Sequence, residues 1–406
     1  MMKEPSKWSV VVINRYTRSL SFNERLYLCL DEICPPLCNQ LFFEGSGSLD
    51  YAKWCKAVEI ASEANPGSRL VLEGYLGSSR WVDSGLTPRV REVDGSTWDG
   101  YGPEGAPFLM ERLLYHEGPT CEVILIRGSK PRVAFRTHHG VMDGRGTMTW
   151  IEDIFRALNG LDVLGAPLTL NDYQLARSFQ KQKCESYPVE HIAPTGRAIG
   201  NERGMIWKRI IIEGRYHNIL GRCAKLIARE AWKHSPGGVV RIGIPVDMRP
   251  RLGGQRSTAN LVLPVIVEVK PETTPEQIAD DIAFQIKHGY EGMLSPGDDL
   301  HRYVPVRLLA SLARKIIDVR HSRGLYSLSG YLTHMGHIPV DNFRGGGFQA
   351  TAFWGIPPGE YYPFFLGMAS YGNTQAFCLT MPKVLASEGR MDEILNNILQ
   401  GLQNDT

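Results

Sequence analysis

A chain of 406 residues is long enough to form one large or two medium-sized domains with ample core. Charged residues make up 22% and hydrophobic residues 43%, which is typical of a soluble globular protein, and a net charge of +2 provides no strong field for nucleic acid or an anionic membrane surface. No apolar run reaches the length of a membrane span, and the N-terminal residues carry a base without an adjoining hydrophobic region, so we expect neither a transmembrane segment nor a secretory signal.

Eight cysteines are scattered along the chain without the spacing of a disulfide framework. In a chain of this size we expect them to be reduced thiols of a cytoplasmic protein. Residues 34–38, Cys-Pro-Pro-Leu-Cys, are a poor candidate for a metal knuckle because of the prolines and because no second pair of ligands accompanies them.

The N-terminal part contains helix and strand patterns followed by a polar segment. Ser21 followed by Glu24 is the pattern of a capping box, which predicts that a helix begins there. Residues 51–64 have the periodicity of an amphipathic helix, which the following Asn-Pro-Gly should end. A β-branched run predicts a strand at 8–14, whereas the Gly, Asp, Ser and Pro content of 83–107 predicts a loop.

A predicted hairpin and helix enclose the segment richest in potential catalytic groups. Residues 122–126 and 132–136 read as strands joined by a Gly-Ser-Lys turn, and 147–158 have apolar positions at helical spacing. Between them, residues 137–146 carry two histidines, an aspartate and three glycines. Catalytic groups are often mounted on loops held by rigid elements, so this segment is the candidate functional site.

The remainder of the chain reads as an irregular segment followed by strands and helices. Residues 159–205 are loop-like apart from a helix around 173–184, and we interpret this segment as a crossover between two lobes. A turn is expected at 345–347, and residues 353–359 are expected to be loop and core. Strands are predicted at 207–213, 239–247 and 376–381, and helices at 216–233, 274–288 and 391–402.

The motif His-His-x-x-x-Asp-Gly, complete from His138 to Gly144, resembles the active-site motif of the CoA-dependent acyltransferase superfamily. This superfamily includes chloramphenicol acetyltransferase-like enzymes, condensation domains of nonribosomal peptide synthetases, and free-standing acyltransferases of natural-product and lipid assembly. The resemblance implies that His139 is the general base and that Asp143 is buried, pairs with an arginine and holds the loop in shape. It also implies that glycines such as Gly144 let the backbone turn sharply and leave room for substrate.

The residue types suit acyl transfer, but two other interpretations of the cluster remain open. Transfer from a thioester to an alcohol or amine needs a base that accepts a proton near neutral pH, and the unperturbed pKa of histidine lies there. The cluster could instead bind a metal, or contain core histidines with satisfied hydrogen bonds. A metal site would need a third ligand from another element, and no clear His-x-x-His or Cys-x-x-Cys pair supplies it.

Other segments resemble further parts of the same superfamily. Residues 70–75 and 106–115 resemble strands that lead towards the histidine motif. Pro-Val-Asp-Met-Arg at 245–249 resembles the place where an arginine reaches back to the motif aspartate, which implies a pair of Arg249 with Asp143. Arg249 could instead be a surface residue at the end of a strand. In the strand-like segment 258–269, the resemblance implies that Asn260 shapes the wall of a substrate tunnel.

Residues 327–338 resemble the superfamily segment Ser-Asn-x-Gly, with Thr333 at the serine and His334 at the asparagine. A hydroxyl at Thr333 would donate a hydrogen bond to the oxyanion that develops during acyl transfer, and the change from asparagine to histidine would alter the detailed geometry. His334 and His337 have a spacing that invites a metal interpretation. On a strand, however, their side chains would point to opposite faces, so core or tunnel-lining positions are expected.

The resemblance implies an α/β (α+β) fold with two chloramphenicol acetyltransferase-like lobes of mixed β-sheet with helices. The lobes are expected at 1–165 and 206–406, with a crossover at 166–205 and one active site in a tunnel at their interface, and a monomer is plausible. The implied reaction moves an acyl group from a phosphopantetheine thioester, carried by CoA or by an acyl carrier protein, to an amine or alcohol. It resembles the condensation steps of nonribosomal peptide and polyketide biosynthesis, and it needs no metal, bound cofactor or nucleic acid.

Two alternatives belong to other functional classes. The chain could be a catalytically inactive binding or structural module of the same fold, although such relatives usually lose the second histidine and His139 is present. A hydrolase, in which His139 would activate water, is a third interpretation, but no Gly-x-Ser-x-Gly motif supports it.

Overall fold

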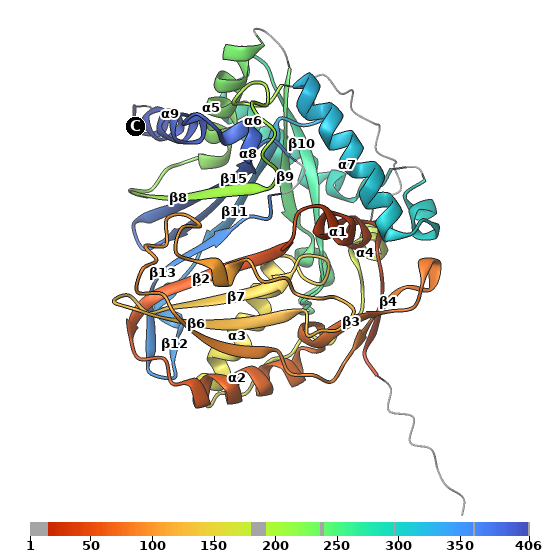
Figure 1. Ribbon diagram of the computed structural model, residues 1–406, viewed down its shortest axis with the longest axis vertical. Helices are drawn as coiled ribbons and strands as arrows, with labels where there is room; N and C mark the ends of the chain where they lie inside the picture. Colours follow the sequence, from red (N-terminus) through yellow and green to blue (C-terminus); the bar gives the residue numbers. More distant parts are fainter. Residues whose placement is uncertain (1–14, 180–191, 236–238, 296, 360–361, 405–406) are drawn as a thin grey trace, which may run out of the picture.

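The computed structural model describes residues 15–179, 192–235, 239–295, 297–359 and 362–404, in which mixed sheets and helices form two lobes (Figure 1). The described strands make two six-stranded sheets and one three-stranded sheet. This agrees with the expected α/β fold of two lobes of mixed sheet with helices.

The first sheet carries the strand that leads into the histidine motif. All its neighbouring strands are antiparallel except β5 and β6, which are parallel. Its order is β12 (Arg344–Gly345), β13 (Phe348–Ile356), β2 (Cys38–Gly47), β7 (Arg132–His138), β6 (Cys121–Arg127) and β5 (Arg89–Asp94). Helices α2 (Tyr51–Ala64) and α3 (Gly144–Leu158) pack on each other, and in Figure 1 α2 lies at the bottom of the molecule and α3 behind the strands of this sheet. The core between them is aromatic, with Phe43, Trp54, Phe135 and Phe155 in contact.

The second sheet mixes parallel and antiparallel pairs, since β11 runs parallel to both β9 and β14. Its order is β10 (Val262–Val269), β9 (Val240–Asp247), β11 (Gly330–His337), β14 (Phe365–Tyr371), β15 (Thr374–Pro382) and β8 (Met205–Glu213). The helices that pack around this sheet, at the top of Figure 1, are α5 (Ile219–His234), α6 (Pro275–Lys287), α8 (Lys383–Ala386) and α9 (Arg390–Asn404).

A smaller layer lies at the side of the two lobes. Its sheet has the order β1 (Thr17–Ser19), β4 (Arg80–Asp83) and β3 (Leu70–Glu73). Helix α1 (Phe22–Ile33) packs against α7 (Val306–Arg323), and α4 (Asp172–Phe179) lies beside them in Figure 1. No helix among the described residues has both the length and the apolar character needed to cross a membrane.

The two sheets do not follow a single boundary in the sequence. Residues 344–356 form β12 and β13, and β13 pairs with β2 over Phe348–Ile356, so this part of the C-terminal half belongs to the first sheet. The division at 1–165, 166–205 and 206–406 is therefore wrong for these two strands. Strand β13 also contacts β14 and β15, so it connects the two sheets next to the candidate site.

The helices and strands that the local sequence pattern predicted most clearly are present in the structure. The hairpin of β6 and β7, the helix α3 after the motif and the helix α2 are confirmed. The capping box of Ser21 and Glu24 is formed, with the Glu24 N–H donating to Ser21 Oγ at 3.2 Å and the Ser21 N–H donating to the Glu24 carboxylate at 2.9 Å. Thr274 caps α6 in the same way. The strands expected at 70–75, 207–213, 239–247, 258–269, 327–338 and 376–381 and the helices at 216–233 and 391–402 are present with small shifts of their ends.

Three local predictions are wrong. Residues 83–107 contain β5, a partly exposed edge strand rich in charged residues that is ordered by its parallel pairing with β6. Residues 106–115 are not a strand but a short 3₁₀ turn, Pro107–Leu109, and irregular chain. Residues 353–356 belong to β13 and not to a loop, because β2 supplies its partner, whereas the expected place in the core is confirmed by the buried Phe353 and Trp354. The strand expected at 8–14 and the end of the helix expected at 173–184 lie outside the described residues.

Candidate active site

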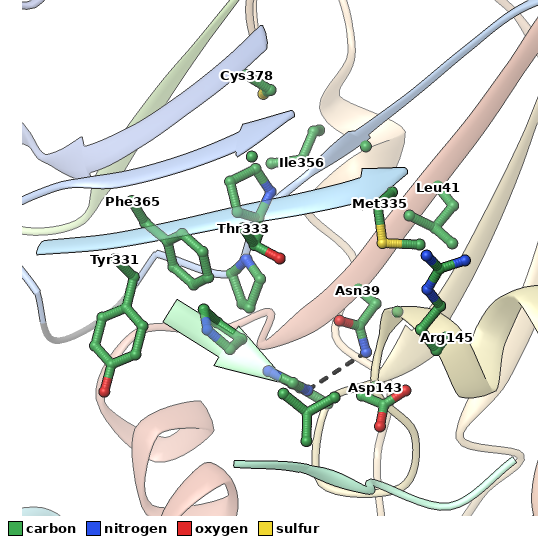
Figure 2. Close-up of a pocket in the computed structure, with 18 of the residues that line it drawn as sticks. Asn39, Leu41, Asp143, Arg145, Tyr331, Thr333, Met335, Ile356, Phe365 and Cys378 are labelled. Atoms are coloured by element: carbon green, nitrogen blue, oxygen red, sulfur yellow. Dashed lines mark hydrogen bonds between the residues drawn. The ribbon is translucent and has the colours of Figure 1, made fainter. Parts of the chain in front are cut away.

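A cavity of about 290 Å³ lies between the two sheets, and the histidine motif opens into it. Strands β2 and β13 of the first sheet, helix α1 and the motif loop line it together with β9, β11 and β14 of the second sheet (Figure 2). Its lining is largely aromatic and aliphatic, with fewer polar groups. The apolar side chains include Leu41, Trp354, Ile356, Pro357, Phe365 and Met368.

His138 is a buried structural residue and does not line the cavity. The Gly140 N–H donates to His138 Nδ1 at 3.0 Å, so Nδ1 is an acceptor and the ring carries its proton on Nε2, which lies 3.6 Å from Asp31 Oδ2. Burial acts to raise the pKa of Asp31, but contacts with His138, the Leu37 N–H and Arg112 outweigh it and hold this pKa below its usual value. The Gly140 N–H therefore fixes the tautomer of His138, and the carboxylate of Asp31 on helix α1 lies near the protonated Nε2.

His139 is the histidine that faces the cavity. Its ring stacks on Tyr27 with centroids 4.0 Å apart, and its Nδ1 lies 3.3 Å from the Met142 carbonyl oxygen. Asn39 Nδ2 also lies 3.4 Å from this Nδ1, and this contact is the dashed line in Figure 2. The Asn39 amide does not need the ring as an acceptor, because it donates to Met142 O at 2.7 Å and has Thr137 Oγ1 as a further acceptor. A carbonyl oxygen can only accept, so the tautomer with the proton on Nδ1 is favoured and Nε2 keeps its lone pair.

Burial makes His139 a neutral base. Desolvation lowers its pKa to about 4, because the contacts with the Met142 carbonyl and the charge of Asp143 only partly offset the loss of water. The loop backbone is held on both sides of the ring: the His139 N–H donates to Leu37 O at 2.9 Å, and Asn260 Nδ2 donates to His139 O at 2.5 Å. At neutral pH the ring is therefore unprotonated and fixed in position.

Asp143 closes the motif loop onto helix α3 and onto the second lobe. It is the N-cap of α3, and its Oδ1 accepts from the Gly146 N–H at 2.7 Å. Arg249 donates to both carboxylate oxygens at 3.0–3.2 Å, and the Leu261 N–H donates to Oδ2 at 2.7 Å. The predicted pair of Arg249 with Asp143 is thus present, and Arg249 is buried in it and not a surface residue. Burial acts to lower the pKa of Arg249, but Asp143 and Asp247 outweigh it and raise that pKa.

The glycines of the motif are required for space and not for a left-handed backbone. Gly140, Gly144 and Gly146 all lack a positive φ, so the sharp turn expected from their conformational freedom is not the reason for them. A Cβ on Gly146 would lie 2.2 Å from Thr258 O, and one on Gly144 would meet the sulfur of Met335 at 3.3 Å on the cavity side. Gly146 permits the close approach of α3 to the segment before β10, and Gly144 leaves room in the cavity.

Thr333 and His334 of β11 line the cavity opposite the motif loop. His334 Nδ1 accepts from the Gly336 N–H at 2.9 Å, and its Nε2 lies 3.3 Å from Ser370 Oγ. Burial first, and then the charge of Arg145, lower the pKa of His334. A bulge between His334 and His337 leaves His337 exposed, so the expectation of a core or tunnel position is wrong for it. No group of three potential metal ligands occurs within the described part of the chain.

Asn260 does not line the cavity, which corrects the expectation that it shapes a tunnel wall. It is 2% exposed and supports the backbone of His139 from behind. Three further residues were not identified from the sequence: Tyr27 and Asn39 around the base, and Asp31 behind His138. They lie about 100 positions before the motif, and no spacing rule connects them to it; only the pairing of β2 with β7 and the packing of α1 do so.

Comparison with known proteins bears on the fold. No protein-family model matches the sequence, and no curated protein sequence matches it. Among solved structures, the starter condensation domain of rhizomide synthetase, a double mutant in complex with C8-CoA and Leu-SNAC, matches with a TM-score of 0.67 and 12% identity, covering 96% of this chain and 94% of that chain. The unmutated domain gives a TM-score of 0.60 at 13% identity, with 95% of each chain covered. The condensation domain of Monacolin K polyketide synthase gives 0.62 at 11% identity, covering 95% of this chain and 96% of that chain. The protein therefore has the fold of these condensation domains.

Proposed function

We propose that this protein is an acyltransferase that moves an acyl group from a phosphopantetheine thioester to an amine or alcohol. The observation that carries the proposal is His139, a neutral imidazole held by its Nδ1 side that faces an otherwise largely apolar cavity between the two lobes. A base that stays unprotonated at neutral pH and meets a water-poor cavity suits proton removal from a bound nucleophile.

The proposed reaction begins with the acceptor. As its nitrogen or oxygen attacks the thioester carbonyl carbon, the acceptor proton passes to His139 Nε2 and a tetrahedral intermediate forms. The intermediate collapses when the C–S bond breaks, the electron pair leaves with sulfur, and the imidazolium returns its proton to the thiolate. The products are an amide or ester and a free pantetheine thiol, so atoms and charge balance without a cofactor or metal.

The residues around the base have separable roles in this scheme. The Thr333 hydroxyl is the candidate donor to the oxyanion, which carries charge only in the intermediate and the adjacent transition states. The stack on Tyr27 and the hydrogen bond from Asn260 hold the base in place, and the Asp143–Arg249 pair holds the loop that carries it. Gly144 leaves the space in which the substrates meet.

The comparisons support the class of donor without identifying it. The rhizomide synthetase domain was solved with C8-CoA and Leu-SNAC, and its fold is shared over nearly the whole chain. For the present protein we propose acyl-CoA or an acyl carrier protein as donor, an amine or alcohol as acceptor, and a condensation role in cytoplasmic natural-product biosynthesis.

The test is single-turnover acyl transfer with acyl-CoA and acyl carrier protein as donors and a pool of amines and alcohols as acceptors. Wild type, His139→Ala and the control His217→Ala, which changes an exposed histidine away from the cavity, are compared by product mass spectrometry. Products should form with wild type and His217→Ala and be reduced at least about 100-fold with a folded His139→Ala. Equal rates for all three would refute the assignment of the base, and failure of every donor with wild type would favour an inactive binding module.

A further inference from the structure

Arg145 is a cation in the cavity without a direct partner among the described residues. It is the second residue of α3, and its side chain lines the cavity. Its guanidinium makes no hydrogen bond or ion pair with the described part of the chain. Other buried or partly buried arginines differ from it: Arg18 pairs with Glu24 at 2.9 Å, Arg209 with Glu44 at 2.6 Å and Arg249 with Asp143 at 3.0 Å.

The position of Arg145 in the cavity is defined by its neighbours. A Cβ on Gly336 would lie 3.3 Å from Arg145 Nη2, so the guanidinium rests against the bulge of β11. Figure 2 shows the side chain extending from the start of α3 towards Met335 on that strand. Thr333 and His334 lie on the same stretch of β11 and also face the cavity.

Nearby carboxylates are already committed to other arginines. Asp143 and Asp247, which both line the cavity, bind Arg249, with Asp247 Oδ1 2.7 Å from Arg249 Nη1. Glu152, two turns along α3, pairs with Arg256 at 3.1 Å, and the charge of Arg145 acts on it only from a distance and less strongly than that of Arg256. Removing a cation from water is costly unless an anion compensates it, and here the protein provides no carboxylate in contact.

We propose that Arg145 binds a carboxylate of the acyl acceptor, so that the acceptor is an amino acid or hydroxy acid with a free carboxyl group. This inference rests on the proposed acyl transfer and adds the substrate class. The planar guanidinium suits a carboxylate through two parallel hydrogen bonds. We assign the carboxylate to the acceptor and not to the acyl chain, because the acceptor's attacking group must contact His139. Arg145 follows His139 closely in the chain, at the start of the helix that the motif loop enters. The apolar lining farther from Arg145 in Figure 2, including Ile356 and Phe365, remains for the acyl chain.

Binding of product analogues tests the proposal independently of turnover. N-octanoyl amino acids and their carboxamides form matched pairs that differ only in the charged group, and calorimetry gives the dissociation constant of each. Wild type should prefer the carboxylate by roughly tenfold or more, the value of a charge-assisted hydrogen bond. Arg145→Met should abolish the preference and Arg145→Lys should keep part of it. The control Arg344→Met, an exposed arginine of β12 outside the cavity, should keep it in full.

A second arm separates the acceptor from the phosphates of CoA. If Arg145 served the donor, Arg145→Met would raise KM for acyl-CoA and leave KM for acyl-pantetheine, which lacks the nucleotide phosphates, unchanged. That result would overturn the proposal. It would also be overturned if wild type bound the carboxylate and the carboxamide equally well, or if it bound neither of them. A carboxylate preference that depends on Arg145 but comes without any acyl transfer would support the anion site while refuting the proposed function.

Discussion

The Asp143–Arg249 pair is the connection between the motif loop and the second lobe, and Arg249→Met tests its contribution to stability. The substitution keeps much of the side-chain volume and removes all five guanidinium donors. Asp143, which is 2% exposed, loses three hydrogen bonds of 3.0–3.2 Å from the guanidinium. The carbonyl oxygens of Ser257 and Ala259 also lose the guanidinium donors that lie 3.0 and 2.6 Å from them. Breaking a buried pair in this way costs about 3–5 kcal/mol.

The lower end of that range is expected here. After the substitution Asp143 still accepts from the Gly146 and Leu261 N–H groups, both at 2.7 Å, so its carboxylate is not left wholly without donors. We therefore expect a loss of about 3 kcal/mol in the free energy of unfolding. This is a large part of the roughly 5–15 kcal/mol that stabilises a typical protein.

Urea denaturation followed by tryptophan fluorescence and by circular dichroism measures the loss, and agreement of the two probes checks that unfolding is two-state. Arg344→Met, an exposed control, should stay within about 0.5 kcal/mol of wild type. Asp143→Asn combined with Arg249→Met should be more stable than the sum of the single effects predicts, by about 1–3 kcal/mol. A loss below about 1 kcal/mol for Arg249→Met, or strict additivity in the double variant, would refute the reasoning.

Three further predictions concern the base, the oxyanion and the motif glycines. Because burial lowers the pKa of His139 to about 4, the base is neutral above that pH, and kcat/KM should decrease on acidification only near pH 4. A decrease of kcat/KM with an apparent pKa near 6.5 would contradict this. Thr333→Val should lower kcat by about 10²-fold with little change in substrate binding, and Thr333→Ser should recover most of it; an equal loss in both would contradict an oxyanion role. Gly146→Ala should destabilise the protein by about 1–3 kcal/mol in thermal unfolding, because its Cβ would lie 2.2 Å from a backbone oxygen. Gly144→Ala should lower the stability less, and it should impair substrate binding.

Several parts of this protein could be predicted from local sequence alone. The capping box of Ser21 and Glu24 needs only residues three apart, and the hairpin of β6 and β7 needs only a short turn between two apolar runs. The His-His-x-x-x-Asp-Gly motif identified the loop and, through its resemblance to a superfamily, the pair of Arg249 with Asp143. Each of these signals is local or carried by a short motif, so each can be read without knowing the tertiary structure.

Tertiary structure decided what surrounds the motif. Strand β2 brings Asn39 to the His139 ring, and α1 brings Tyr27 and Asp31, although these residues lie about 100 positions earlier in the chain. Strand β13 looked like a loop because its partner β2 lies some 300 positions before it, and the sequence does not state that pairing. The low pKa of His139 and the lack of a partner for Arg145 among the described residues also depend on burial and on neighbours from both lobes. A motif names the reacting groups, but their protonation and the shape of their cavity are set by contacts between distant segments.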